Sequence, residues 1–259
     1  MNLELKGKRV LVTGASKGLG LGIVKAFLAE GATVVAVARH STPELDATEA
    51  TFIAADLSDP DGPRQMVRAA GPHLDVLVNN VGGGNPPAAA FDDPLDGDDE
   101  VWADLFALNL SAAVRTIRAA LPALTQARGA IVNISSDAAL RPGAAPMPYA
   151  AAKAALNSLS RGLAEKLAPQ GVRVNTVTPS GVRGYSQEGP DGYVANLAKH
   201  LGMEHSALLE VLPSQGGMLT GRLAEPEEVA PAVLLLASPV CSSAIGENWT
   251  VTAGAVKAV

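Results

Sequence analysis

The sequence predicts a doubly wound α/β domain built on a mostly parallel sheet. Short β-branched runs alternate with longer helical stretches almost to the end of the chain. The runs are apolar throughout, which is typical of strands that helices cover on both faces. No internal repeat and no linker divides the 259 residues, of which 47% are hydrophobic. A single domain with a large buried core is therefore expected over residues 1–259.

The strands and helices follow from these patterns in chain order. The runs that predict strands are RVLVTG, ATVVAVA, ATFIAA, LDVLVNN, GAIVNIS and VRVNTV. Helices are predicted over Leu19–Glu30, Asp61–Ala70, Glu100–Arg128 and Tyr149–Ala168, with a further helix beginning at Pro226. Gly31, Gly71 and Gly129 are expected to end the first three of these helices.

Residues 179–221 break the alternation, because glycine and proline are frequent there. Two short amphipathic helices are predicted inside the segment. Tyr193, Leu197 and Leu201 have helical spacing, as do Leu208, Leu209 and Leu212. Because the segment follows a strand whose carboxyl end faces the usual ligand site, we expect it to be a substrate lid, with a passive surface excursion as the alternative.

The composition disfavours several classes of partner. Lys and Arg number 20 against 26 Asp and Glu, and the net charge of −6 leaves no basic excess for nucleic acid or an anionic membrane. No apolar run approaches the roughly 18 residues of a membrane-spanning helix. The lone Cys241 fits a reducing compartment, and no secretory segment is visible, so a cytoplasmic location is expected. The four histidines are scattered, and no metal site is predicted.

A glycine-rich turn follows the first predicted strand and precedes the first helix. The segment TGASKGLG places Gly14, Gly18 and Gly20 at this junction. Glycines let the backbone approach a pyrophosphate closely, and a helix N-terminus offers free N–H groups to it. Strand, glycine turn and helix in this order predict a dinucleotide site.

Several motifs together resemble those of the short-chain dehydrogenase/reductase family over essentially the whole chain. They are TGxxxGxG at Thr13–Gly20, NNVG at Asn79–Gly82 where the family has NNAG, Asp56 after the third strand, and YAAAK at Tyr149–Lys153. NTVTPSG, from Asn175 to Gly181, has an extra Ser180 before its glycine, and GENWTVTAG resembles the family's closing strand and turn. The resemblance implies a Rossmann-type domain with a seven-stranded sheet.

The expected cofactor is NADP in preference to NAD. A 2′-phosphate needs a cation at the end of the second strand, where NAD sites usually place an acidic residue. Arg39 occupies this position and Lys17 lies inside the glycine turn, although both could be ordinary solvated charges. The residues expected to bind the cofactor are Gly14, Ser16, Lys17, Gly18, Leu19, Gly20, Arg39, Asp56, Leu57, Asn80, Val81, Gly82, Tyr149, Lys153, Pro179, Gly181 and Val182.

Tyr149 and Lys153 are the predicted centre of the chemistry. They are four residues apart at the start of a helical stretch and so share one helix face. A nearby ammonium is expected to lower the pKa of the phenol, which is otherwise near 10. Ser136 follows a strand thirteen residues before Tyr149, a spacing that the family shares, with Ser135 as the neighbouring alternative. By the same resemblance Asn109 completes the set, although Ala112 replaces the glycine of the family's NxxG pattern.

The resemblance implies hydride transfer between nicotinamide and a carbonyl carbon. Tyr149 would act as general acid and base, Lys153 would stabilise the phenolate and bond the nicotinamide ribose, and Asn109 would hold a water that relays protons. Ser136, Tyr149, Tyr185 and Met218 are the expected substrate-binding residues.

Two other functions stay open at the level of sequence. One is reduction of a 3-oxoacyl thioester on an acyl carrier protein, and the other is non-catalytic dinucleotide sensing on the same fold. The resemblance also implies a homotetramer or homodimer acting on a small-molecule carbonyl or alcohol.

Overall fold

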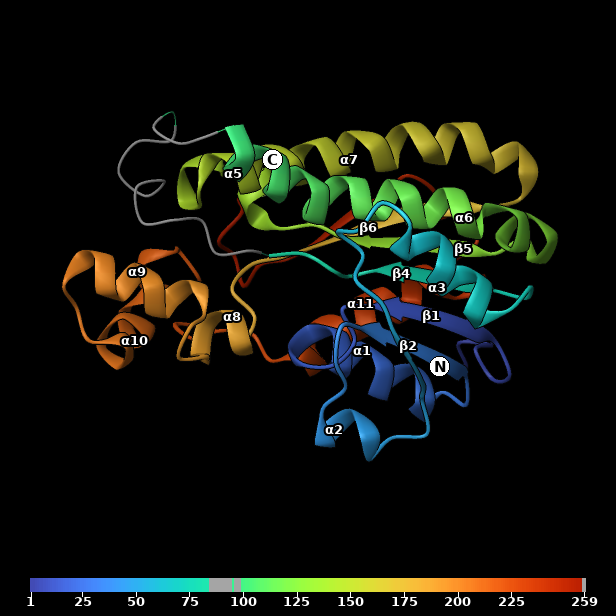
Figure 1. Cartoon of the computed structure of the whole chain (residues 1–259), viewed down its shortest axis with the longest axis horizontal. Coiled ribbons are helices and arrows are strands. Elements are labelled where there is room, and N and C mark those ends of the chain that lie inside the picture. The colour runs from blue at the N-terminus through green and yellow to red at the C-terminus, as the bar shows by residue number, and fades with distance from the viewer. Residues whose placement is uncertain (84–94, 96–98, 258–259) are drawn as a thin grey trace.

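The computed structural model describes residues 1–83, 95 and 99–257, and its strands form one parallel sheet (Figure 1). The strands are β1 (Arg9–Thr13), β2 (Thr33–Ala38), β3 (Thr51–Ala54), β4 (Val76–Asn79), β5 (Ala130–Ile134), β6 (Arg173–Pro179) and β7 (Asn248–Val251). These seven strands lie in the order β3-β2-β1-β4-β5-β6-β7, and every neighbouring pair is parallel. The predicted fold class is confirmed, and the strand order reverses between β1 and β4, where ligands bind in such folds.

Helices cover both faces of the sheet. In chain order they are α1 (Gly18–Ala29), α2 (Pro43–Asp46), α3 (Gly62–Ala70), α5 (Asp99–Phe106), α6 (Ala112–Ala127), α7 (Met147–Leu167), α8 (Tyr185–Glu188), α9 (Tyr193–Leu201), α10 (His205–Gln215) and α11 (Pro226–Ala237). In the described residues no helix is both long enough and apolar enough to span a membrane.

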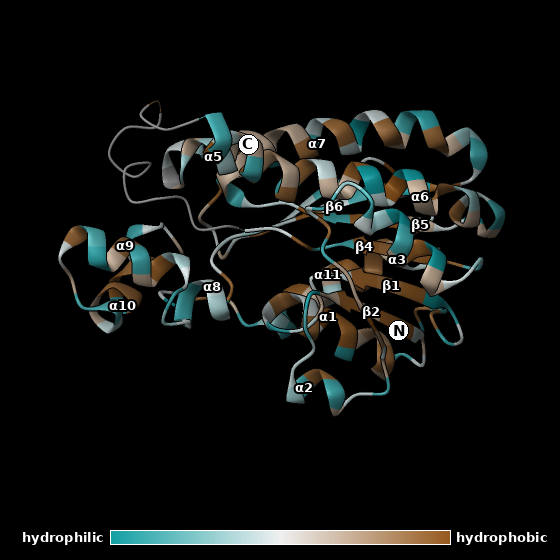
Figure 2. Ribbon diagram, viewed as in Figure 1, coloured by the Kyte–Doolittle hydropathy of each residue, from teal (hydrophilic) through white to brown (hydrophobic). Residues whose placement is uncertain are grey.

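The core forms two apolar layers, one on each side of the sheet (Figure 2). Val10 and Val12 of β1 pack with α1 and α11, whereas Leu11 between them packs with α3 and α6. Successive side chains of a strand point to opposite faces, which explains why Val10, Leu11 and Val12 are apolar in succession. The edge strands β3 and β7 are partly exposed. The prediction that helices cover both faces of every strand is therefore correct only for the central strands.

Glycine ends two of the predicted helices but not the third. Gly31 and Gly71 have φ of 77° and 94° after α1 and α3. After α6 the left-handed residue is Arg128, with φ of 50°, so the stop predicted at Gly129 is wrong by one residue. Gly129 is required for another reason, because a Cβ there would lie 2.3 Å from the Asp75 carbonyl oxygen.

The helix predicted over Glu100–Arg128 contains a π-helical turn, Ala107–Ser111, between α5 and α6. One extra residue per turn changes which side chains face inward, and such turns are frequent at functional sites. Asn109 lies in this turn and is 1% exposed. The turn therefore directs an amide side chain into the protein interior.

After β6 the chain leaves the sheet and forms α8, α9 and α10, which lie together at one end of the molecule (Figure 1). The two predicted amphipathic helices are confirmed as α9 and α10. Their apolar faces pack on each other through Val194, Ala198 and Leu208, which form a cluster separate from the two main layers. The short helix α8 was not expected from the sequence.

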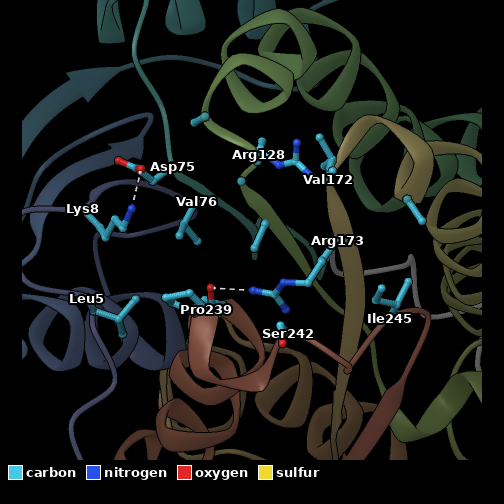
Figure 3. Close-up of a pocket in the computed structure, with 16 residues that line it drawn as sticks. Leu5, Lys8, Asp75, Val76, Arg128, Val172, Arg173, Pro239, Ser242 and Ile245 are labelled. Carbon is cyan, nitrogen blue, oxygen red and sulfur yellow. Dashed lines mark hydrogen bonds and ion pairs between the residues drawn. The ribbon is translucent and has the colours of Figure 1, made fainter.

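A cavity of about 310 Å³ lies at the amino ends of the central strands (Figure 3). Lys8 and Asp75 form an ion pair of 3.2 Å there. The Arg173 guanidinium donates to the carbonyl oxygens of Leu236 and Ala237, at 2.7 and 2.9 Å. These contacts satisfy carbonyl groups at the end of α11 and belong to the framework of the fold.

Candidate active site

The glycine turn between β1 and α1 has a shape that larger residues would disturb. Gly14 and Gly18 have φ of 64° and 53°, in the left-handed region. A Cβ at Gly20 would lie 2.1 Å from the Gly14 carbonyl oxygen. The turn thus lies directly against the start of α1, whose free N–H groups and positive dipole end suit a pyrophosphate.

Asn80 joins the glycine turn to the end of β4. Its Nδ2 donates to the carbonyl oxygens of Thr13 and Gly14, both at 3.0 Å. The Thr13 hydroxyl in turn accepts from the backbone N–H groups of Asn80 and Val81, both at 3.0 Å. These bonds hold the ends of β1 and β4 together at the point where the strand order reverses.

Lys17 after β1, Arg39 after β2 and Asp56 after β3 lie close enough for charge and burial to shift the pKa values of Lys17 and Asp56. Burial lowers the pKa of Lys17, and the positive charge of Arg39 lowers it further. Hydrogen bonds from Ser58 lower the pKa of Asp56, and Arg39 contributes in the same direction. Because Lys17 and Arg39 repel each other, an anion placed between them would be stabilised by both.

Lys17 also contacts the segment after β6. Its Nζ lies 3.4 Å from the centroid of the Tyr185 ring. Tyr185 was predicted to bind substrate, but the structure places it over the glycine turn and not among the described residues that line the substrate cavity. Tyr185 is the first residue of α8, and its ring lies against the cation at the start of α1. Its role in substrate binding stays a prediction.

Apart from Tyr149 and Lys153, which lie on α7, the predicted cofactor residues stand at or just after the carboxyl ends of strands. Gly14, Ser16, Lys17, Gly18, Leu19 and Gly20 follow β1, Arg39 follows β2, Asp56 and Leu57 follow β3, Asn80, Val81 and Gly82 follow β4, and Pro179, Gly181 and Val182 end or follow β6. This placement suits a dinucleotide across the switch point. Their contacts with a cofactor remain predictions.

Tyr149 and Lys153 lie one turn apart at the beginning of α7. Lys153 is 3% exposed, and its Nζ donates to the Ile134 carbonyl oxygen at 2.9 Å and lies 5.9 Å from the Tyr149 ring centroid. Burial lowers the pKa of Lys153 to about 8. The ammonium is thus held in place by β5 and remains mostly charged at neutral pH.

The phenol of Tyr149 is less acidic than the sequence suggested. Burial raises the pKa of Tyr149, a hydrogen bond from Ser136 lowers it, and the negative charge of Asp137 raises it. The expected acidification by Lys153 is wrong for this structure, because burial outweighs the other influences. A phenol that keeps its proton at neutral pH is in the state that a general acid requires.

Asn109 and Lys153 meet at Gly82. A Cβ at Gly82 would lie 2.9 Å from both Asn109 Oδ1 and Lys153 Nζ. Asn109 Nδ2 donates to the carbonyl oxygens of Gly83 and Leu105, at 2.8 and 2.9 Å, and its Oδ1 accepts from the Gly83 N–H at 2.9 Å. The amide thus fixes the backbone after β4 directly beside the buried ammonium.

Ser136 and Tyr149 line one cavity of about 260 Å³ at the carboxyl ends of β5 and β6. The predicted substrate residue Met218 lines it as well. Ser135 also contributes to the lining, but it is 4% exposed and its hydroxyl lies 3.5 Å from the Lys153 carbonyl oxygen. Tyr193 of α9 faces the same cavity, and burial raises its pKa to about 12, with the charge of Tyr149 adding to this. The segment after β6 therefore provides one wall of the cavity.

A polar cluster beside Ser136 was not anticipated. Asp137 accepts hydrogen bonds from the hydroxyls of Ser136 at 3.3 Å and Ser180 at 2.8 Å, and Arg141 lies 3.8 Å from it. Asp137, Arg141 and Ser180 all line the cavity. The sequence showed Ser180 only as an extra residue in a motif. Asp137 and Ser180 follow two different strands, so no local signal indicated that they would meet.

A model of the short chain dehydrogenase family matches residues 8–188. The chain belongs to the short-chain dehydrogenase/reductase family. The match ends at the last residue of α8, so α9 and α10 lie beyond it.

Relatives of the chain support the same assignment. L-xylulose reductase from Bos taurus is 35% identical over 98% of both chains. A 3-oxoacyl-(acyl-carrier-protein) reductase from Vibrio cholerae is 31% identical over 98% of both chains. The structure of L-sorbose reductase from Gluconobacter frateurii, complexed with NADPH and L-sorbose, matches 100% of both chains with a TM-score of 0.87 and 28% identity.

Members of this family transfer hydride to or from NAD or NADP, and this protein is accordingly a dehydrogenase/reductase that acts on CH-OH groups. The non-catalytic sensing alternative loses its support. Among the described residues no group of three or more His, Cys, Asp and Glu side chains is arranged to hold a metal ion.

Proposed function

We propose that this protein is an NADPH-dependent oxidoreductase that interconverts a ketone or aldehyde and an alcohol, with Tyr149 as general acid and base. The main support is that Ser136 and Tyr149 share one cavity at the carboxyl edge of the sheet, one helical turn from the buried Lys153. Ligands of open α/β sheets bind at this edge.

In the reducing direction, this chain supplies a hydrogen bond and a proton to the carbonyl oxygen. When bound, a reduced nicotinamide supplies hydride to the carbonyl carbon. Ser136 donates a hydrogen bond to the carbonyl oxygen, and Tyr149 donates its proton as negative charge develops there. The phenolate that remains lies in the first turn of α7, where the positive end of the helix dipole and the charge of Lys153 stabilise it.

Lys153 and Asn109 have different tasks in this scheme. Lys153 is charged at pH 7, since its pKa is about 8, and so can also bond the nicotinamide ribose. Both donors of the Asn109 amide are already used, and Oδ1 keeps one lone pair for a relaying water. We therefore assign Asn109 mainly to positioning of Gly82 and Gly83.

The preference for NADP is assigned to Arg39 and Lys17. Arg39→Glu reverses the charge at the end of β2, so we expect it to raise KM for NADPH by roughly 10- to 100-fold, since one charge-assisted hydrogen bond contributes about 1.5–3 kcal/mol. Lys25→Glu on the exposed side of α1 makes the same charge change and should leave the NADPH to NADH ratio of kcat/KM unchanged. A wild-type protein that uses both cofactors equally would contradict the assignment.

The catalytic proposal is tested by the loss of reduced-nicotinamide absorbance across a panel of ketones and aldehydes. Turnover of at least one carbonyl with NADPH is the expected result. Absence of turnover across the panel, with NADPH shown to bind, would refute it.

Reduction of a 3-oxoacyl thioester is the second candidate, favoured by the likeness to the Vibrio cholerae reductase. It predicts a strong loss of activity when the carrier protein is removed from the substrate. Equal activity on carrier-free ketones would exclude it.

Two further features belong to this proposal. Residues 179–221 act as a substrate lid, because α9 and the residues after α10 wall the cavity. The protein assembles as a homodimer or homotetramer, which light scattering after size-exclusion chromatography measures directly.

A further inference from the structure

Asp137 places a carboxylate next to the reacting position. Its side chain is 17% exposed and lines the same cavity as Ser136 and Tyr149. Ser180 Oγ donates to Oδ2 at 2.8 Å, and Arg141 Nη1 lies 3.8 Å from the same oxygen. Arg141 is itself held by the Gly216 carbonyl oxygen at 2.6 Å. Oδ2 of the carboxylate is therefore held by Ser180 and Arg141.

The other oxygen, Oδ1, faces Ser136. Ser136 Oγ is 3.3 Å from Oδ1 and is also within reach of Tyr149. A hydroxyl has one proton, so Ser136 cannot donate to Asp137 and to a substrate oxygen together. When the substrate takes this proton, Oδ1 loses its donor. An ionised carboxylate only accepts hydrogen bonds, so it then favours a substrate that brings a donor of its own.

The position of that donor is set by the spacing of the groups. Oδ1 and Ser136 Oγ are neighbours, and Ser136 is assigned to the carbonyl oxygen. A hydroxyl on the carbon adjacent to a carbonyl lies about one hydrogen-bond length from the carbonyl oxygen, which matches this arrangement. A thioester carbonyl in place of the hydroxyl would present another acceptor to a carboxylate and would be repelled.

We propose that the substrates are α-hydroxy carbonyl compounds, in which Asp137, held by Ser180 and Arg141, accepts a hydrogen bond from the adjacent hydroxyl. The inference rests on the proposed function. The carbonyl carbon gains hydride from NADPH, the carbonyl oxygen gains the Tyr149 proton, and the product is a vicinal diol with oxidised NADP. The adjacent hydroxyl keeps its proton and its oxidation state throughout.

The test uses matched substrates that differ only in the adjacent hydroxyl. The pairs are 3-hydroxy-2-butanone with 2-butanone, and 2-hydroxyacetophenone with acetophenone. For the wild-type protein we expect kcat/KM to favour the hydroxylated member of a pair by roughly 10-fold or more. Asp137→Asn should reduce that ratio by about 10-fold. Ser180→Ala should reduce the ratio in the same direction.

Control measurements separate recognition from damage to the fold. Glu165→Gln removes an exposed carboxylate from α7 and should leave both activities unchanged. NADPH affinity, measured by fluorescence, should be the same in Asp137→Asn as in the wild type. Asp137→Asn should also move the alkaline limb of the reduction profile to lower pH, because the negative charge of Asp137 raises the pKa of Tyr149.

The possible results of these measurements separate a failure of this inference from a failure of the proposed carbonyl reductase function. Equal activity on both members of each pair, or an unchanged ratio in Asp137→Asn, would overturn the inference and leave a carbonyl reductase. A preference for pyruvate that Arg141→Met abolishes would also overturn it, in favour of keto acids. No turnover of any carbonyl by NADPH-bound protein would overturn both.

Discussion

Replacement of Gly82 by alanine tests how closely the catalytic groups are held. The added Cβ would lie 2.9 Å from both Asn109 Oδ1 and Lys153 Nζ, where ordinary contact begins at 3.4 Å. Both groups, or the backbone at residue 82, must therefore shift by about 0.5 Å (3.4 − 2.9). Asn109 is fixed by three hydrogen bonds and Lys153 by Ile134. Since a misplacement of about 1 Å can cost 10²-fold, we expect kcat to fall by roughly 10-fold.

Stability and turnover should be measured on the same preparations. Overpacking costs about 1–3 kcal/mol, which urea unfolding would detect. Gly162→Ala in α7 is the matched control, because nothing lies within 4 Å of its added Cβ. It should keep wild-type kcat and gain up to about 1 kcal/mol. Wild-type kcat in folded Gly82→Ala would refute the claim that Lys153 and Asn109 act from these positions.

Three other predictions concern separate parts of the molecule. Asn109→Ala should lower kcat about 10-fold, because the Gly83 backbone loses the two hydrogen bonds that hold it. Wild-type kcat together with wild-type stability would contradict the positioning role. Lys153→Met should remove a pH dependence of the free energy of unfolding. The pKa of Lys153 is about 8 in the folded protein and 10.5 in the unfolded chain, so the unfolded chain binds more protons between these values. As pH rises from 8 to 10.5 the wild type should therefore gain about 3 kcal/mol of stability relative to the variant, measured by urea unfolding. Arg173→Met should cost about 2–4 kcal/mol, because carbonyl groups at the end of α11 lose their donors, with kcat of the folded fraction unchanged. An unchanged urea midpoint would refute this last prediction.

Local signals in the sequence predicted most of the framework. The apolar strands, the glycine turn and the YAAAK motif each depend on nearby residues, and the structure confirms the elements they predicted. The helix end predicted at Gly129 was wrong because glycine is needed there for another reason. Its backbone approaches Asp75, just before β4, too closely for a Cβ, and the helix pattern does not show this contact. The π-helical turn around Asn109 could not be predicted either, because inserting one residue into a helical turn does not alter the amino-acid composition by which a helix is recognised.

In the candidate site, too, local features could be predicted from the sequence and contacts between distant segments could not. Ser136, Tyr149 and Lys153 could be predicted to lie together, because their spacing is local and resembles a known motif. The direction of the Tyr185 side chain could not be predicted, because it depends on α8 and on contact with Lys17. The raised pKa of Tyr149 was missed, since a sequence shows the nearby cation but not the burial that outweighs it. Asp137 and Ser180 meet only because β5 and β6 are neighbours in the sheet.

The central claim is that the Tyr149 phenol supplies the proton when hydride reaches the carbonyl carbon. Tyr149→Phe keeps the ring and removes that proton. The most direct measurement is therefore turnover of a carbonyl by this variant at saturating NADPH, alongside a fluorescence titration of NADPH binding. We expect binding to be nearly unchanged and turnover to fall by about 10²- to 10⁴-fold. Turnover close to that of the wild type, in a purified and cofactor-saturated sample, would contradict the account.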